Sequence, residues 1–156
     1  MPGTDQVVIL YTDTSDSALA NQARMTLRVQ NAGAAFDLTD LTLRYWFTDD
    51  GQSDFIAEID YAAQGNGADF DKADVNVTFA EEFGSNYALI AFTGGDNVGA
   101  QGVVEQVQVR IHTNGYATLD QSNDFSFSAD GAAVTNRNIT PYINGTQAGG
   151  CVPQPP

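Results

Sequence analysis

The sequence predicts an all-β protein, an antiparallel β-sandwich arranged as a jelly roll of about nine strands. Short segments of alternating apolar and polar residues recur along the chain, and turns rich in Gly, Asn, Asp and Ser separate them. No segment has a sustained apolar period of 3.6 residues, and residues 17–24 favour at most a short turn of helix. Two sheets packed face to face in Greek-key order accommodate such strands.

The candidate strands follow one another without an internal repeat. Each is a short run dominated by β-branched, aromatic or other apolar residues and bounded by turn residues. They span Val7 to Tyr11, Met25 to Gln30, Leu41 to Phe47, Phe55 to Asp60, Val75 to Phe79, Tyr87 to Phe92, Val103 to His112, Phe125 to Ser128 and Thr140 to Asn144.

The strand from Val103 to His112 predicts a sheet with a polar outer face, because successive side chains of a strand point to opposite sides. Val103, Val107, Val109 and Ile111 fall on one side, and Gln106, Gln108, Arg110 and His112 fall on the other. A polar outer face is common in β-sandwiches, and we interpret His112 as a surface strand residue rather than a base or a metal ligand.

The composition suits one domain with a real core, since 42% of the 156 residues are hydrophobic and no stretch approaches the length of a membrane span. We assign residues 1–148 to a β-sandwich module and residues 149–156, rich in Pro and Gly, to the start of a linker. The single Cys151 rules out an internal disulfide. No signal peptide is recognisable at Met1, so we expect an excised module of a larger protein.

The charge balance argues against nucleic acid and membranes as partners. Twenty acidic residues against six basic ones give a net charge of −14, which repels phosphate backbones and anionic lipids. A neutral polymer experiences no such repulsion, and the acidity favours solubility.

No catalytic residues are predicted, and we expect no enzyme activity. The chain has one His, its only Cys lies in the tail, and the Gly-x-Ser-x-Gly and Gly-x-x-x-x-Gly-Lys motifs are absent. Two carboxylates can hydrolyse glycosides, but no pair among the many acidic residues is distinguished by its surroundings.

Two oxygen-rich turns predict one site for a hard cation. They are Thr48 to Gly51 and Asp120 to Asp124, and each adjoins a run of aromatic strand residues without His or Cys. Carboxylate, amide, hydroxyl and backbone oxygens are the ligands that Ca²⁺ prefers. The alternative is that Asp, Asn, Ser and Gly gather in these turns only because their side chains hydrogen-bond local backbone.

Several stretches resemble the family 3 carbohydrate-binding module, the cellulose-binding module of bacterial cellulases and cellulosome scaffolding proteins. The stretches are Leu41 to Gln52, Phe92-Thr93-Gly94-Gly95, Gln121 to Phe127 and Thr140 to Gly145. The match extends over nearly the whole chain. It implies a jelly-roll fold, noncatalytic binding of cellulose or a related β-glucan, and covalent linkage to a catalytic or scaffolding module of an extracellular protein.

The resemblance also implies site residues. A structural Ca²⁺ would be held by Thr48, Asp50, Asp120, Asn123 and Asp124, where Asp120 replaces the usual Thr and adds a carboxylate. A row on one flat sheet face would bind crystalline cellulose through Asp60, Tyr61, Gln108, Arg110 and Tyr116, with tyrosines where the family commonly has His and Trp. The segment Gln64 to Asp74 is shortened and offers only Phe70 to extend this row, which favours the enzyme-borne subgroup over the scaffoldin subgroup.

A second aromatic cluster has two interpretations. Arg44, Trp46 and Phe125 match a shallow groove opposite the cellulose face, where they would contact a linker peptide or a single glycan chain. The alternative is packing in the core or beside the cation site, because aromatic rings bury much area. Two other functions also stay open: a helper module beside a glycoside hydrolase with weak or no cellulose binding, and a module for polysaccharide sensing or protein interaction.

Overall fold

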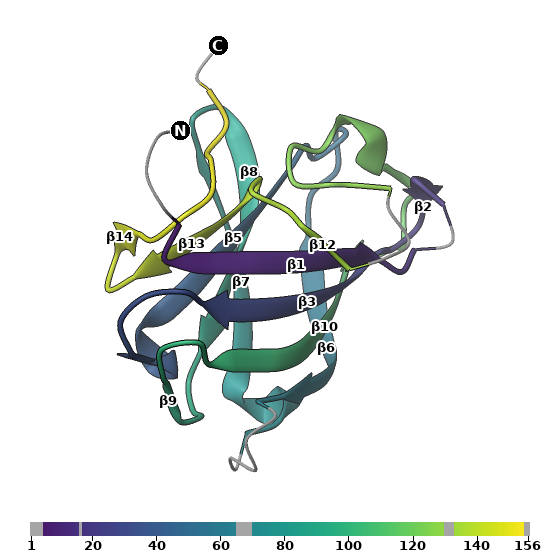
Figure 1. The fold of residues 1–156 in the computed structure, drawn as a ribbon. Coiled ribbons are helices and arrows are strands. Elements are labelled where there is room, and N and C mark those ends of the chain that lie inside the picture. Colours follow the sequence, from purple (N-terminus) through teal and green to yellow (C-terminus); the bar gives the residue numbers. More distant parts are fainter. Residues whose placement is uncertain (1–4, 16, 65–69, 130–132, 155–156) are drawn as a thin grey trace.

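The computed structural model describes residues 5–15, 17–64, 70–129 and 133–154, and within them two five-stranded antiparallel sheets form a sandwich (Figure 1). The first sheet has the order β12 (Val134–Thr135), β1 (Val7–Asp13), β3 (Ala23–Asn31), β10 (Val103–Thr113) and β6 (Phe55–Ala63). The second has the order β14 (Thr146–Gln147), β13 (Ile139–Ile143), β5 (Leu41–Phe47), β8 (Ser85–Phe92) and β7 (Val75–Glu82). This arrangement confirms the predicted fold class.

Short elements complete the described part of the chain. Two-residue strands pair as β2 (Leu19–Ala20) with β11 (Leu119–Asp120), and as β4 (Phe36–Asp37) with β9 (Asn97–Val98). Three single turns of 3-10 helix are η1 (Leu38–Asp40), η2 (Lys72–Asp74) and η3 (Gln121–Asn123). No helix among the described residues has the length and apolar character needed to cross a membrane.

The core lies between the two large sheets and follows from the alternation of side chains. Every second residue of β3 is buried, from Ala23 to Asn31, while the residues between them are only partly covered. Tyr11 of the first sheet and Tyr45 of the second stack across the interface with ring centroids 6.2 Å apart. The two inner faces together form one apolar cluster.

The predicted strands agree with the structure except at one segment. Phe125 and Ser126 form a turn, in which the backbone N–H of Phe127 donates to the Asp124 carbonyl at 3.2 Å. The Ser126 hydroxyl accepts a bond of 2.7 Å from the backbone N–H of Trp46, and the Asn138 side chain donates to the Phe125 carbonyl. Residues 17–24 contain β2 and the start of β3 rather than a turn of helix.

A β-bulge in β6 determines which of its residues face outward. Gln108 of β10 pairs with Tyr61, whereas the next residue, Val109, pairs with Ile59, so that Asp60 is an extra residue without its own partner. Asp60 and Tyr61 are consequently both exposed, although strict alternation would send them to opposite faces. The bulge thus brings two consecutive side chains onto one surface.

The chain beyond residue 148 contacts the sandwich, although its composition favours a linker. The backbone N–H of Cys151 donates to the Arg137 carbonyl at 2.6 Å, and the Thr140 hydroxyl donates to the Cys151 carbonyl at 2.6 Å. Gly150 has φ +67, and a Cβ there would lie 2.7 Å from the Arg137 oxygen. Gly150 and Pro153 are buried, so the packed body extends past Gly149 to Pro153.

Candidate binding face and cation site

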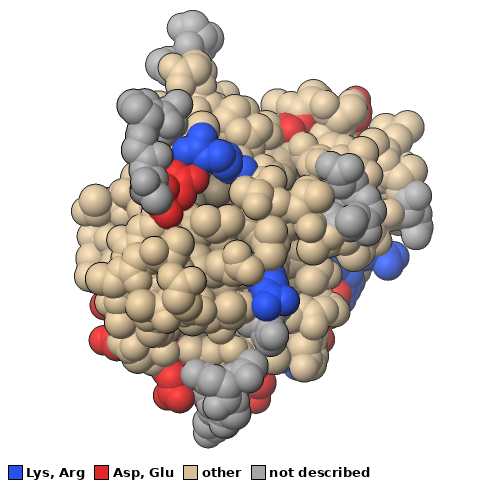
Figure 2. All heavy atoms as spheres, viewed as in Figure 1, with Lys and Arg blue, Asp and Glu red and all other residues tan. Residues whose placement is uncertain are grey.

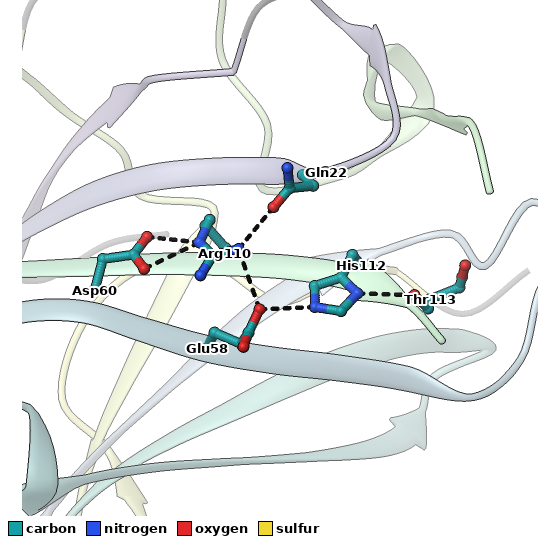
Figure 3. Close-up of polar contacts among 6 residues, drawn as sticks. All are labelled: Gln22, Glu58, Asp60, Arg110, His112 and Thr113. Atoms are coloured by element: carbon teal, nitrogen blue, oxygen red, sulfur yellow. Dashed lines mark hydrogen bonds and ion pairs between the residues drawn. The ribbon is translucent and has the colours of Figure 1, made fainter. Parts of the chain in front are cut away.

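Arg110 is the centre of a polar network on the outer face of the first sheet (Figure 3). Its Nε donates to both carboxylate oxygens of Asp60, at 3.0 and 2.7 Å. Its Nη1 lies 3.1 Å from Glu58 Oε2 and donates to Gln22 Oε1 at 2.9 Å. The bond with Asp60 raises the pKa of Arg110 above its already high ordinary value. The guanidinium is therefore charged and fixed in one plane by three neighbours.

His112 and Tyr116 continue this network at one end. The two rings are stacked, with centroids 4.1 Å apart and planes within 5° of parallel. His112 Nε2 lies 2.9 Å from Glu58 Oε2, and Nδ1 lies 2.7 Å from the Thr113 carbonyl oxygen. Both nitrogens face acceptors, so only a ring protonated at both of them donates to both.

The position of His112 corrects the sequence interpretation, because the residue is only 4% exposed. Its side chain points outward as alternation predicts, but Tyr116 covers it. Tyr116 adopts φ 55, and its N–H donates to the Thr113 carbonyl at 3.0 Å, which turns the loop back over the strand. The tyrosine ring is itself 45% exposed and presents its other face to solvent.

Contacts link the residues into a continuous row, which we call the strip. It runs from Tyr116 over His112, Glu58 and Arg110 to Asp60, as the pairs above show. Tyr61, which is 48% exposed, follows Asp60 directly, and Gln108 is its partner across β10 and β6. The structure thus places all the predicted row residues, Asp60, Tyr61, Gln108, Arg110 and Tyr116, on one outer face.

Three members of this network were missed from the sequence: Gln22, Glu58 and His112. Alternation is a sufficient signal for two of them, since Glu58 lies two residues before Asp60 and His112 lies two residues after Arg110. Gln22 precedes β3, and no sequence pattern marks it. Phe70, the only aromatic residue of the shortened segment, is 7% exposed and packs near Phe92, so it does not extend the strip. Residues 65–69 lie outside the described part of the chain.

Figure 2 shows that residues that are neither acidic nor basic cover most of the face over β1 and β3, with acidic side chains gathered toward the lower margin. The strip itself contains matched charges, because Arg110 contacts both Asp60 and Glu58. Despite the net charge of −14, this surface does not present a dense negative field to a ligand.

The two oxygen-rich turns meet, as the sequence predicts. The backbone N–H of Thr48 donates to Asp124 Oδ1 at 2.8 Å, and its hydroxyl contacts Asp124 and Asn123. Asp50 accepts from the Asp120 N–H at 2.9 Å and from the Asn123 amide at 3.0 Å. Asp50 and Asp120 are 70 positions apart in the sequence, yet the two turns form one cluster of oxygen atoms.

Asp124 is the most perturbed carboxyl of this cluster. Burial raises its pKa to about 7, and the nearby charges of Asp50 and Asp120 act in the same direction, against the hydrogen bonds from Thr48. A cavity of about 10 Å³ lies beside Thr48, Asp50 and Asp124. Within the described residues no three His, Cys, Asp or Glu side chains converge as a metal cluster, so a cation here would also need hydroxyl, amide or backbone oxygens.

The second aromatic cluster surrounds Arg44 on the other sheet. The guanidinium carbon lies 4.4 Å from the Tyr87 ring centroid and 4.5 Å from that of Tyr142, and Nη1 lies 2.6 Å from Glu82. Trp46 is fully buried, and its Nε1 donates to the Thr140 hydroxyl at 3.0 Å. Trp46 offers no surface to a ligand, so its assignment to a groove is wrong and packing is its role.

Comparison with known proteins agrees with the fold. A family model described as a cellulose binding domain matches residues 8–150. Cellulosomal-scaffolding protein B of Acetivibrio thermocellus is 34% identical over 92% of this chain, and endoglucanase 5 of Pectobacterium carotovorum is 28% identical over 96%. The chain spans 19% and 30% of their respective lengths.

A solved structure has the same fold. The family IIIA cellulose-binding domain of Clostridium cellulolyticum superimposes with a TM-score of 0.86 at 28% identity, and the match covers 97% of this chain and all of that domain. Both a scaffolding protein and an enzyme are among the relatives, so these matches do not separate the two subgroups. The chain belongs to the family 3 carbohydrate-binding modules, the cellulose binding domains.

Proposed function

We propose that the chain binds crystalline cellulose through the strip, without catalysis, and thereby holds a covalently attached enzyme or scaffold near its substrate. The observation that supports this most is the continuity of the strip, in which two exposed tyrosines flank the ion pairs of Arg110 with Asp60 and Glu58. A pyranose ring has apolar C–H faces and hydroxyl groups at its rim. Aromatic rings cover such faces, while carboxylate, guanidinium and amide groups bond the rim.

The proposal includes an extracellular location as part of a larger protein. Scaffolding proteins and endoglucanases among the relatives are several times longer than this chain, as the covered shares show. Tethering of this kind raises the local concentration of the attached module at the polymer rather than lowering a reaction barrier.

Sedimentation with cellulose tests the proposed function. The purified chain should leave the supernatant when microcrystalline cellulose is added, and a flat strip should favour this material over amorphous cellulose. Binding should change little between low and high salt, because the ligand is neutral. A protein that stays in the supernatant with both materials would contradict the proposal and favour a helper or sensing module.

His112 should act as a positioning residue for Tyr116. Substitution of His112 by Ala removes the ring beneath Tyr116, and we expect about threefold weaker adsorption because the tyrosine loses its fixed plane. His112→Phe keeps a flat ring and should restore most of the binding. Adsorption isotherms on crystalline cellulose measure both. Equal losses in the two variants, at unchanged melting temperature, would show that stacking does not position Tyr116.

We also propose a structural Ca²⁺ at the meeting point of the two turns. Thr48, Asp50, Asp120, Asn123 and Asp124 would hold it, some of them through backbone oxygens, and bound calcium would supply positive charge next to the buried Asp124. Two features favour a cation: the all-oxygen donor set and the raised pKa of the buried Asp124. Imidazole and thiol groups are absent from this set, which argues against zinc or copper.

Removal of calcium should lower the melting temperature. Calcium at about 100 times its dissociation constant stabilises the folded state by about 2.7 kcal/mol, which corresponds to about 5–10 °C for a domain of this size. Differential scanning calorimetry with a chelator, and then with excess Ca²⁺, measures the shift. Asp124→Asn is the matched variant and should abolish the response to Ca²⁺. The calcium site would be contradicted if the melting curves of the wild type in chelator and in excess Ca²⁺ superimposed.

The proposal of a noncatalytic module predicts no turnover. The purified chain should release no reducing sugar from soluble or insoluble glucans during long incubation, because the sequence marks no carboxylate pair as acid and base. Activity that survives repurification and disappears on substitution of one carboxylate pair would contradict this expectation.

A further inference from the structure

A recess opens beside the strip on the same face of the first sheet. Its volume is about 240 Å³, which is closer to one sugar unit than to a larger ligand. The polar side chains that line it are Thr14, Arg24, Thr26, Asp60, Gln108 and Arg110. Asp60, Gln108 and Arg110 also belong to the strip, so a polymer lying along the strip passes the mouth of the recess.

The recess holds two guanidinium groups with different surroundings. Arg24 of β3 and Arg110 of β10 are direct partners in the sheet register, where like charges oppose each other unfavourably. Arg110 is compensated by Asp60 and Glu58. For Arg24, no carboxylate lies within ion-pair distance among the residues that the structure describes.

The backbone of Arg24 is nevertheless firmly held. Its N–H donates to the Ser15 hydroxyl at 2.9 Å, and its carbonyl accepts from the Thr14 N–H at 3.0 Å and from the Ser15 hydroxyl at 3.3 Å. The backbone of Arg24 is therefore fixed, while its guanidinium pairs with no carboxylate among the described residues. Among the described residues, Arg24 thus offers a positive charge in a recess whose other polar lining is hydroxyl and amide groups and the paired Asp60 and Arg110.

We propose that the recess binds the carboxylate of a uronic acid unit in an acidic polysaccharide. Arg24 pairs with the carboxylate, and Thr14, Thr26 and Gln108 bond the neighbouring hydroxyl groups. The inference rests on the proposed function, because the backbone of the polymer lies along the strip. The net charge of −14 repels any polyanion at long range. Binding of the carboxylate in the recess is therefore best measured at a salt concentration near 0.15 M, where the screening length is about 8 Å.

Adsorption to two preparations of the same cellulose fibrils tests the site. One preparation is plain, and in the other some C6 hydroxymethyl groups are oxidised to carboxylates. Arg24→Gln should weaken adsorption to the carboxylated fibrils by about fivefold and leave adsorption to the plain fibrils unchanged. Arg24→Lys keeps the charge but loses the planar fork, so its loss should be intermediate.

Lys72→Gln is the control, because it removes the same charge from an exposed residue of η2 that takes no part in the recess. A selective loss in Arg24→Gln with none in Lys72→Gln supports the site. Equal losses in both variants would assign the effect to overall charge, and no loss in either would also overturn the site. Adsorption of the wild type to the plain fibrils tests the strip separately. The ratio of the affinities of Arg24→Gln and wild type for the carboxylated fibrils tests the recess, whatever the result with the plain fibrils. Matching melting temperatures confirm that the variants fold.

Discussion

Replacing Tyr116 with Ala should weaken binding to crystalline cellulose by about tenfold or more. The ring is 45% exposed and is held flat on His112, so it can cover the face of a glucose unit without first being ordered. An aromatic ring used in this way contributes about 1–3 kcal/mol of binding free energy. Adsorption isotherms on microcrystalline cellulose measure the change.

A matched control is Phe83→Ala, which removes an aromatic ring that is 39% exposed at the turn between β7 and β8 of the other sheet. Its adsorption should equal that of the wild type. Both variants need thermal melting to show that they fold. Retained affinity in Tyr116→Ala, or an equal loss in Phe83→Ala, would contradict the role given to the strip.

The largest loss of stability is expected for Trp46→Ala, at about 3–5 kcal/mol, because a fully buried indole leaves a cavity. Its ring lies 4.9 Å from that of Tyr87, and its N–H donates to the Thr140 hydroxyl, which in turn donates to the Cys151 carbonyl. The indole therefore connects the second sheet to the C-terminal segment. Urea unfolding followed by far-ultraviolet circular dichroism measures the change without the tryptophan signal.

Thr140→Val separates the hydrogen bond from the packing. It keeps the volume but leaves the indole N–H without its acceptor, which costs about 1–3 kcal/mol. If Trp46 serves only in packing, Trp46→Ala and Thr140→Val both lose stability, while the folded fraction of each variant binds cellulose normally. The packing role would be contradicted if Trp46→Ala unfolded at a urea concentration near that of the wild type but no longer bound a soluble glucan. That result would favour the groove interpretation.

The sequence was sufficient for the outward direction of Gln108 and Arg110 but not for Val103, because a β-bulge between Val104 and Val107 buries Val104 instead. Gln108 and Arg110 point outward as alternation requires, and the resemblance to family 3 modules adds Asp60, Tyr61 and Tyr116 to the same side. Alternation alone would separate Asp60 from Tyr61. Their common orientation comes from the bulge, whose position depends on the pairing of two strands and leaves no mark in the sequence of either one.

Alternation could not decide whether outward-facing residues are buried, so packing of Trp46 stayed an alternative and the burial of His112 was missed. Alternation sends both His112 and Trp46 away from the core between the sheets. His112 is covered by Tyr116 because the intervening loop turns back, and Trp46 is covered by Phe83, Tyr87 and the turn at Ser126. Both coverings depend on loops whose course is set by tertiary contacts and positive φ angles rather than by local periodicity.

Protection of tyrosines from nitration tests most directly whether the strip contacts cellulose. Tyr61 and Tyr116 are exposed, Tyr87 and Tyr142 are half-buried beside Arg44 on the other sheet, and the remaining tyrosines are buried. With the protein bound to cellulose nanocrystals, mass spectrometry should show that nitration of Tyr61 and Tyr116 falls together, while Tyr87 and Tyr142 react as in free protein. Unchanged nitration of Tyr61 and Tyr116 in the bound protein, or protection of Tyr87 and Tyr142 instead, would contradict binding through the strip.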